Sequence, residues 1–400
     1  MNYDFDNVIS RKGTGSIRWD TVEEKYGEPD LIPLTTADMD FPAAPPIQEA
    51  IKRAADFGIF GYTRATTSYY EAVIERFSQK WNWNIQRDWI LHSPGVVGAV
   101  AYCIQGMTSP GDGVVLPTPM YHPFAHLIED NGRTILRSPL LQTGERFVLD
   151  FASLERQLAH PKAKLMIFCN PHNPIGRSWT YEELHQVCAL CLKYGVPLIS
   201  DEIHCDFVFP GHSFTSAAVP MQKLGGLEHL VVCSSASKSF NLAGLQTSNI
   251  IIPGEQLRKK FARVLTNQHM MELNMLGPIA TEAAYRYCDD WQAQLLAYLD
   301  KNRRYIIDFL RSHTPELIPI PPEATYMLWI DCRNLRLSDE DLEALFVHRA
   351  KVGLNMGSSF GPEGSGFVRL NFASPLKIIS DAMSRIETAI TALRSSGLAS

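Results

Sequence analysis

Short runs of β-branched and other apolar residues alternate with helical patterns through the middle of the chain, and this alternation constrains the fold most. The runs occupy residues 113–117, 164–169, 196–201, 229–235 and 248–252. An amphipathic helix is expected at about 179–194, between the second and third runs. Strand, helix and strand at this spacing predict an α/β fold with a mostly parallel sheet covered on both faces. Ligands of such sheets bind beyond the carboxyl ends of the strands.

A second pattern follows Pro278. It begins with one long helical stretch that is expected to reach about Ser312 and continues with a strand at 325–332, a helix near 338–351, an apolar segment at 366–373 and a helix at 377–394. This order predicts a smaller α+β unit. The first 45 residues are rich in proline and turn residues, and we expect them to lie across both units. The predicted division is a large domain at 46–285 and a small domain formed by 1–45 and 286–400.

Charge and cysteine usage exclude several classes of protein. The 400 residues include 37 basic and 43 acidic side chains, for a net charge of −6, and no long basic run would attract nucleic acid or an anionic membrane. The first residues lack an apolar leader, and no uncharged apolar stretch approaches the roughly 18 residues of a membrane span, so a cytoplasmic protein is expected. The eight cysteines fall in predicted strands and helices, which indicates reduced, buried thiols. Cys188 and Cys191 form a C-x-x-C, for which core packing is favoured over redox or metal chemistry.

The stretch "VVCSSASKSFNLAG" at 231–244 places a lone lysine just after a predicted strand, where charge is otherwise scarce. A buried lysine readily loses its proton. Taken singly, such groups have simple explanations: a solvated lysine, an aspartate that caps a helix, asparagines that form turns before prolines and a tyrosine that packs in the core. Lys238 nevertheless shares this rim of the predicted sheet with several other groups. They are Asp201, Asn170, Asn173 and Tyr121, together with a helix that opens at 93–100.

Together these groups match the needs of an aldehyde cofactor that carries a phosphate and a pyridine ring. Such a cofactor requires a lysine for a Schiff base, a carboxylate for the ring nitrogen and a donor for the phenolic oxygen. It also requires an aromatic face, and backbone amides at a helix start for the phosphate. The sequence therefore predicts that pyridoxal 5'-phosphate binds here, with Lys238 as a neutral nucleophile.

The chain resembles the fold type I pyridoxal-phosphate enzymes of the class I/II aminotransferase group, and within it the MalY/PatB-type cystathionine β-lyases, or C-S lyases. The resemblance extends over nearly the whole chain through "TTADMDFP", "GYT", "SPGVVGA", "PTPMYHPF", "NPHNPIGR", "SDEIHCDFVFPGH", "SASKSFNLAGLQ", "TYMLWIDCR" and "FVRLNFA". It implies a large domain with a mostly parallel seven-stranded sheet between helices, and a smaller α+β domain.

The resemblance also implies residue roles. Lys238 matches the Schiff-base lysine, and Asp201 matches the partner of the ring nitrogen. Asn173 matches the donor to the phenolic oxygen and is also expected to contact the substrate. Tyr121 matches the aromatic residue that stacks on the ring and serves catalysis, and Arg369 matches the arginine that binds the substrate α-carboxylate with its planar fork.

The phosphate would rest on Gly95, Val96, Val97 and the hydroxyl of Ser235, and Tyr62 resembles a tyrosine supplied by a neighbouring subunit, which implies a homodimer with shared active sites. Two positions depart from the usual pattern. His204 stands where a cofactor-contacting tyrosine is common, and Gln246 where many relatives have a phosphate-binding arginine, so the phosphate charge would be balanced less fully.

The reaction expected from this resemblance is β-elimination, in which Lys238 removes the α-proton and a thiolate leaves Cβ of cystathionine or a related cysteine S-conjugate, giving a thiol, pyruvate and ammonia. The substrate side chain would contact Tyr121, residues 37–41 and residues near 356–360. The same residues would also serve an aminotransferase, and a regulatory or partner-binding protein could keep the fold. These two alternatives stay open at this point.

Overall fold

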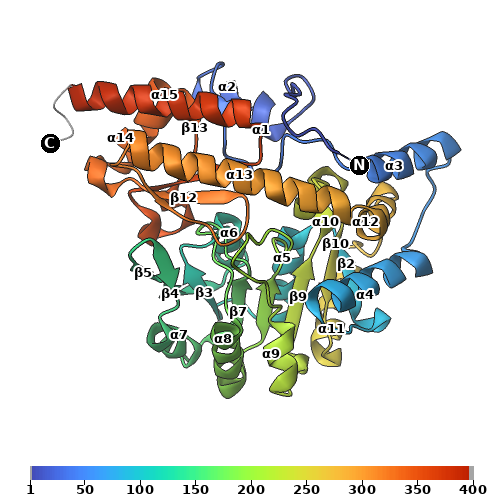
Figure 1. Ribbon diagram of the computed structural model, residues 1–400. Coiled ribbons are helices and arrows are strands. Elements are labelled where there is room, and N and C mark those ends of the chain that lie inside the picture. The colour runs from blue at the N-terminus through green and yellow to red at the C-terminus, as the bar shows by residue number, and fades with distance from the viewer. Residues whose placement is uncertain (1, 396–400) are drawn as a thin grey trace.

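A seven-stranded sheet forms the centre of the larger half of the computed structural model, which describes residues 2–395 (Figure 1). β10 runs antiparallel to its neighbours β2 and β9, and the other adjacent strands are parallel. The predicted α/β fold with a mostly parallel sheet is therefore confirmed. The order across the sheet is β2 (Ile90–Ser93), β10 (Ser248–Ile251), β9 (Leu230–Ser234), β8 (Leu198–Asp201), β7 (Ala163–Cys169), β3 (Gly113–Thr118) and β4 (Thr134–Pro139).

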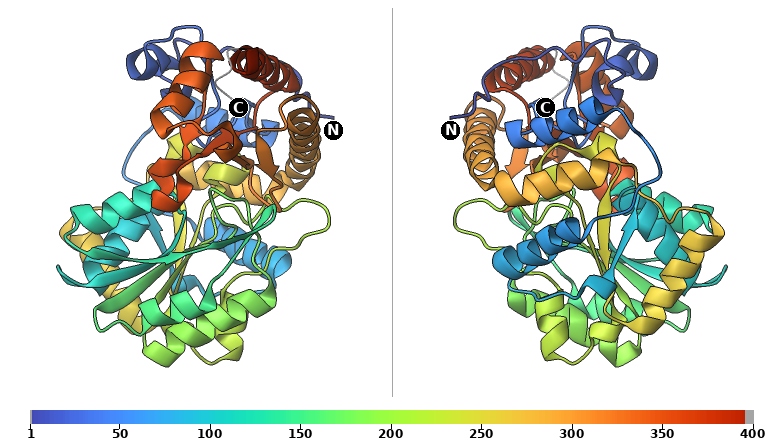
Figure 2. Two further views of the ribbon diagram at one scale, coloured as in Figure 1. Left: turned by 90° about the vertical axis from the view of Figure 1, so that its left-hand side faces the viewer. Right: turned by 90° about the vertical axis from the view of Figure 1, so that its right-hand side faces the viewer.

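Helices cover both faces of this sheet. Successive side chains of each strand point in opposite directions, so one strand packs against both helical layers. In β3, Val114 and Leu116 pack in the layer of α5 (Val96–Met107), α6 (His122–Asp130) and α11 (Glu255–Asn267). Val115 packs on the other face, whose layer contains α4 (Thr67–Trp81), α7 (Phe151–Leu158), α8 (Tyr181–Tyr194) and α9 (Ala218–Lys223). Figure 2 shows the two layers from the sides. Burial on both faces explains why these strands are apolar at nearly every position.

Local signals in the sequence set where the connecting elements begin and end. The Thr180 hydroxyl accepts from the Glu183 backbone amide, and the Glu183 carboxylate accepts in turn from the Thr180 amide, so a capping box starts α8. Gly195, in the left-handed region with φ 64°, ends this helix. β8 then begins three residues later and carries the chain back through the sheet to Asp201.

The smaller half consists of a four-stranded antiparallel sheet in the order β11 (Ile318–Ile320), β12 (Met327–Asp331), β15 (Phe367–Asn371) and β14 (Asn355–Met356). Its apolar core includes residues of α13 (Asp289–His313), α14 (Asp339–Ala344) and α15 (Leu376–Ser395). This half lies over the edge of the large sheet where β3, β7, β8 and β9 end (Figure 1).

The single helix expected from Pro278 to Ser312 was wrong, because the chain forms two helices that meet at Cys288. α12 (Leu276–Tyr287) has Arg286 in its last turn, and α13 starts with Asp289 and Asp290. Acidic groups favour a helix start and basic groups a helix end, so these charges support a break at this point.

The N-terminal segment contacts both halves. It contains α1 (Ile17–Asp20), α2 (Val22–Tyr26) and β1 (Ile32–Pro33), and it leads into α3 (Pro45–Phe57). β1 pairs in parallel with β13 (Val352–Gly353) of the smaller half. Toward the larger half, Asn241 Nδ2 donates to the carbonyl of Met39 over 2.9 Å. The domain limits given above stay a prediction.

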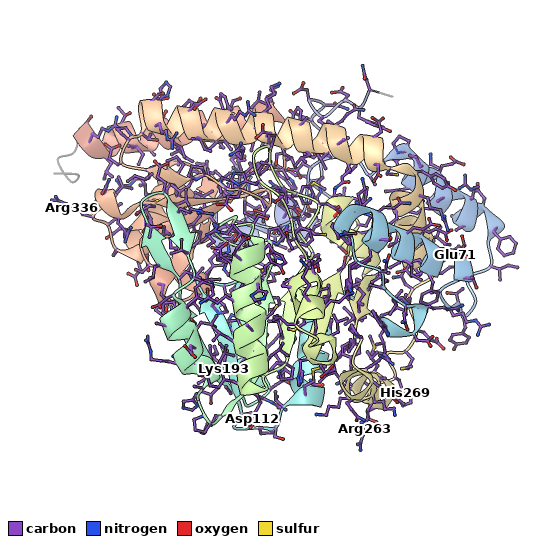
Figure 3. The ribbon with its side chains drawn as sticks, turned by 60° about the horizontal axis from the view of Figure 1, so that its bottom comes forward. Glu71, Asp112, Lys193, Arg263, His269 and Arg336 are labelled. Carbon is purple, nitrogen blue, oxygen red and sulfur yellow. The ribbon has the colours of Figure 1, made fainter. Side chains whose placement is uncertain are left out.

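Charged side chains such as Lys193, Arg263 and Arg336 project outward from the periphery of the molecule (Figure 3). All eight cysteines are buried free thiols. Cys188 donates to the carbonyl of Ala217 and Cys191 lies 3.6 Å from the sulfur of Met166, so both pack in the core as predicted. None of the helices within residues 2–395 has the length and apolar character needed to cross a membrane.

Candidate functional site

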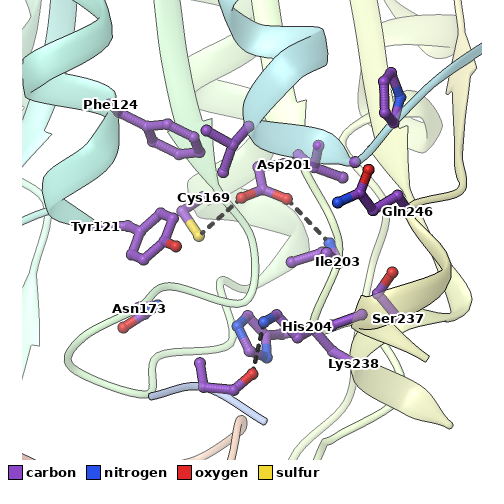
Figure 4. A pocket seen from close by; sticks show the side chains of 16 residues that line it. Tyr121, Phe124, Cys169, Asn173, Asp201, Ile203, His204, Ser237, Lys238 and Gln246 are labelled. Atoms are coloured by element: carbon purple, nitrogen blue, oxygen red, sulfur yellow. Dashed lines mark hydrogen bonds between the residues drawn. The ribbon is translucent and has the colours of Figure 1, made fainter. Parts of the chain in front are cut away.

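A cavity of about 250 Å³ lies beyond the carboxyl ends of β3, β7, β8 and β9, where the N-terminal segment closes over the sheet (Figure 4). Its position agrees with the rim that the strand pattern predicted. The structure brings the following predicted residues together in its lining: Gly95, Val96, Val97, Tyr121, Asn173, Asp201, His204 and Lys238.

Lys238 lies on α10 (Ala236–Ser239), a single turn that follows β9 directly. Its Nζ atom donates to the backbone carbonyl of Ala37 over 2.6 Å. Burial lowers the pKa of Lys238 to about 8, with the carboxylates of Asp38 and Asp201 opposing this effect and Arg369 reinforcing it. A substantial fraction of the amine is therefore neutral near pH 8, as a nucleophile or base requires.

Ser235, by contrast, does not line the cavity. Its hydroxyl donates to the carbonyl of Thr247 over 2.6 Å and accepts from the backbone amide of Ser237, which caps α10. The neighbouring Ser237 lines the cavity instead. In this structure Ser235 therefore positions the turn that carries Lys238.

Asp201 is the last residue of β8, and 4% of its surface is exposed. One carboxylate oxygen accepts from the backbone amide of Ile203 over 3.2 Å, and the other lies 3.9 Å from the Cys169 thiol (Figure 4). Burial raises the pKa of Asp201 to about 6, although Ile203 and Lys238 act in the opposite direction. A carboxylate this poorly solvated would be stabilised by a cationic group placed in the cavity.

The start of α5 provides backbone donors to the same cavity. Gly95 precedes the helix with φ 113°, a conformation that disfavours other residues, and it has no side chain to fill the space before the helix. Within residues 2–395 no side chain caps this end, and the first turn contains no acidic residue. The amides of Val96 and Val97 are thus free to bind an anion, which the helix dipole also favours.

Tyr121 and Asn173 both line the cavity, and Figure 4 shows them on the side away from Ser237 and Gln246. The Tyr121 ring packs edge-on against Phe124 at a centroid distance of 5.5 Å, and burial raises the pKa of its hydroxyl. The Asn173 oxygen accepts from Arg369 Nη1 over 3.0 Å. With its oxygen engaged, Asn173 offers its Nδ2 group as a donor to a ligand.

Arg369 does not reach the cavity lining but lies directly behind Asn173, with 2% of its surface exposed. Burial lowers its pKa to about 10, so the guanidinium is charged at neutral pH. Within residues 2–395 its buried Nε atom has no hydrogen-bond partner. An arginine in this state is an electrostatic site for a carboxylate.

His204 and Gln246, the two departures from the family pattern, also line the cavity. Burial lowers the pKa of His204 to about 3, with Lys238 and Arg369 contributing, so its imidazole is neutral at physiological pH. Neither side chain therefore adds positive charge beside the start of α5. Tyr62 lies outside the cavity and is 97% exposed.

Sequence reasoning missed several residues of the site. Cys169, Ser237 and Phe124 line the cavity, and each lies within a few residues of a predicted site residue. Position relative to a strand end was thus a usable signal for them. Of the residues expected around a substrate side chain, Ala37 lines the cavity, and Phe360 stacks on Arg369 with its ring centre 4.9 Å from the guanidinium carbon.

Comparisons with known proteins agree with this arrangement. Residues 29–386 match the family described as aminotransferase class I and II. The chain is 40% identical to cystathionine beta-lyase PatB of Bacillus subtilis, over 97% of this chain and 100% of that protein. It is 34% identical to protein MalY of Escherichia coli, over 98% and 100% of the two chains.

A solved structure shows the same similarity. Cystalysin from Treponema denticola, described as containing a pyridoxal 5'-phosphate cofactor, superposes with a TM-score of 0.95 at 35% identity, over 98% of this chain and 100% of that one. The chain therefore belongs to the aminotransferase class I and II family, and its fold is that of the fold type I pyridoxal-phosphate enzymes, as the sequence motifs predicted.

Proposed function

We propose that this protein is a pyridoxal-phosphate-dependent C-S β-lyase that cleaves cystathionine or a related cysteine S-conjugate. The reaction consumes one water molecule, and its products are a thiol, pyruvate and ammonia. The observation that carries the proposal is the placement of Lys238, Asp201 and the open start of α5 around one cavity, in a chain that matches cystathionine beta-lyase PatB along the whole length of that protein.

The residues of the cavity fit pyridoxal 5'-phosphate. The uncapped amides of Val96 and Val97 suit the phosphate dianion, and the absence of a side chain at Gly95 leaves room for it. The raised pKa of Asp201 indicates a poorly solvated carboxylate, which a protonated ring nitrogen in the cavity would stabilise. Lys238 provides the amine, and Tyr121 provides an aromatic face. When bound, the cofactor supplies an aldehyde carbon for an amine and a ring that withdraws electrons from the substrate Cα.

Lys238 acts as the general base. Its side chain reaches the cavity from a helical turn that Ser235 caps, and its lowered pKa allows the neutral amine to accept the proton from the substrate Cα. The same nitrogen then holds that proton while the thiolate leaves Cβ. The carbonyl of Ala37, 2.6 Å from Nζ, offers an acceptor for the amine whenever it is not covalently engaged.

Arg369 is the proposed binding site for the substrate α-carboxylate, and Asn173, which lines the cavity, contacts this arginine. Both are held by neighbouring elements before a ligand arrives, so little ordering is needed on binding. The neutral His204 adds no charge that would compete for the carboxylate.

A paired assay tests the proposed function. Purified protein is given cystathionine, once alone and once with a keto acid, and pyruvate and ammonia are measured. The proposal predicts pyruvate and ammonia in a ratio near one without any keto acid. Turnover that requires the keto acid and releases no ammonia would identify an aminotransferase instead.

We further propose a homodimer in which Tyr62 reaches the phosphate of the neighbouring subunit, and a cytoplasmic location. Phe57, Ile59, Phe60 and Tyr62 expose large apolar surfaces on one short segment, which supports burial against a second copy. Eight buried free thiols support a reducing compartment. Sedimentation equilibrium is expected to give twice the chain mass. Tyr62→Phe is expected to release cofactor faster during dialysis without changing that mass.

A further inference from the structure

Asn355 contacts Arg369, the arginine proposed to bind the substrate α-carboxylate. The two residues are directly opposite each other in the pairing of β14 with β15, so their side chains lie on the same face of the small sheet. Arg369 Nη2 donates to Asn355 Oδ1 over 2.7 Å. The register of two strands, rather than a flexible loop, therefore fixes this contact.

The surroundings of Arg369 share one electrostatic property. Besides Asn355, its guanidinium donates to the carbonyl of Thr35 over 2.8 Å and to the side-chain oxygen of Asn173 over 3.0 Å. These acceptors are neutral oxygens, and the ring of Phe360 covers the guanidinium from one side. Within residues 2–395 no carboxylate forms an ion pair with Arg369, so hydrogen bonds orient the arginine while its positive charge stays unneutralised.

A carboxylate at position 355 would neutralise the positive charge of Arg369, although aspartate has nearly the same shape as asparagine. Aspartate would keep the acceptor oxygen and form a partly buried, charge-assisted ion pair with Arg369. A substrate carboxylate would then have to compete with a carboxylate already in place. The amide of Asn355 orients the guanidinium of Arg369 and leaves its positive charge available for the substrate carboxylate.

We propose that Asn355 is a positioning residue for carboxylate recognition, which holds Arg369 in place through a neutral acceptor and thereby preserves its charge for the substrate. The proposal deepens the proposed function, since it rests on Arg369 as the site for the α-carboxylate. It does not depend on whether elimination or transamination follows.

Two variants separate this role from a purely geometric one. Asn355→Asp keeps the acceptor and adds a charge, whereas Asn355→Ala removes the acceptor and adds none. If Asn355 only orients Arg369, Asp should replace it better than Ala. The proposal predicts the opposite order of affinity for a carboxylate, with Asn above Ala and Ala above Asp. Asn334→Asp is the matched control, because it adds the same charge at an exposed position of the same half.

The experiment measures binding by titration calorimetry on cofactor-loaded protein, with two probes that divide the substrate. 3-(Methylthio)propionate carries the carboxylate without the amine, and 2-(methylthio)ethylamine carries the amine without the carboxylate. Asn355→Asp is expected to weaken the acid at least about tenfold and not to weaken the amine. Asn355→Ala is expected to weaken the acid roughly threefold to tenfold. Asn334→Asp should bind both probes as the unmodified protein does.

Three results would overturn the proposal: acid binding by Asn355→Asp that equals the unmodified protein, an Ala variant as weak as or weaker than Asp, or equal losses for both probes. Should Asn355→Asp fail to fold by circular dichroism, unchanged acid binding by Asn355→Ala would be decisive against it. Because neither probe is turned over to pyruvate, failure here is distinct from failure of the lyase assay.

Discussion

Replacing Asp201 by asparagine should make the cofactor-free protein more stable above about pH 6. Asp201 is buried at the end of β8 with one backbone donor at 3.2 Å and a weak thiol contact. Burial raises its pKa from 3.8 to about 6, so without the cofactor this carboxylate opposes folding whenever it is charged. Asparagine has nearly the same shape and no charge to desolvate.

The size of the effect follows from the two pKa values. A difference of about two units, at about 1.4 kcal/mol each, gives a penalty of about 3 kcal/mol at pH 8. Below about pH 4 the Asp201 carboxyl is protonated in the folded state, so folding carries no penalty for burying its charge, and the folded protein has its full stability. That stability is lost as pH rises through about 6. The gain from Asp201→Asn should therefore be about 3 kcal/mol at pH 8 and only about 0.5 kcal/mol at pH 4.

Urea unfolding of cofactor-free protein, followed by circular dichroism at both pH values, measures this difference. Asp308→Asn, at an exposed position on α13, is the control and should leave the free energy of unfolding within about 0.5 kcal/mol. The reasoning is refuted if the Asp201 variant is no more stable than the unmodified protein at pH 8, or if its gain is the same at pH 4. Added pyridoxal phosphate should stabilise the unmodified protein more than the variant, because Asp201 then gains a cationic partner.

Two further predictions concern other buried charges. Arg369→Ala should raise KM for cystathionine by roughly a hundredfold while the cofactor absorbance is retained; steady-state kinetics with a visible spectrum check this, and an unchanged KM would count against the assigned role. Glu323 is 7% exposed and accepts from Arg146 and Arg177 over 2.9 and 3.0 Å. Glu323→Gln should therefore lower the free energy of unfolding by about 3 kcal/mol, and the exposed Glu340→Gln should not; equal urea midpoints for the two variants would contradict the prediction.

The central strands were predictable from the sequence because burial on both faces makes them apolar throughout. β2 and β4 escaped detection among the apolar runs, since each interrupts its apolar residues with polar ones, as in "ILHS" and "TILRSP". They were expected only through the seven strands of the resembling family. The break at Cys288 was missed although the charges of Arg286 and Asp289 signalled it, because apolar periodicity continues across the junction.

For the site, residues that follow strand ends could be predicted, since parallel strands bring their carboxyl ends together. Asn355 could not, because its role depends on the register between β14 and β15, and β14 contains two residues without a strong pattern. Ser235 shows a different limit. A hydroxyl near the lysine can serve a ligand or a helix start, and the choice depends on the carbonyl of Thr247, which lies twelve residues away in the chain.

The imine between Lys238 and the cofactor is tested most directly by reducing the purified, cofactor-loaded protein with borohydride and mapping the modified peptide by mass spectrometry. We expect a pyridoxyl group on Nζ of Lys238 and loss of pyruvate formation in the reduced protein. A pyridoxyl group on another lysine, or no adduct on protein that still releases pyruvate, would contradict it.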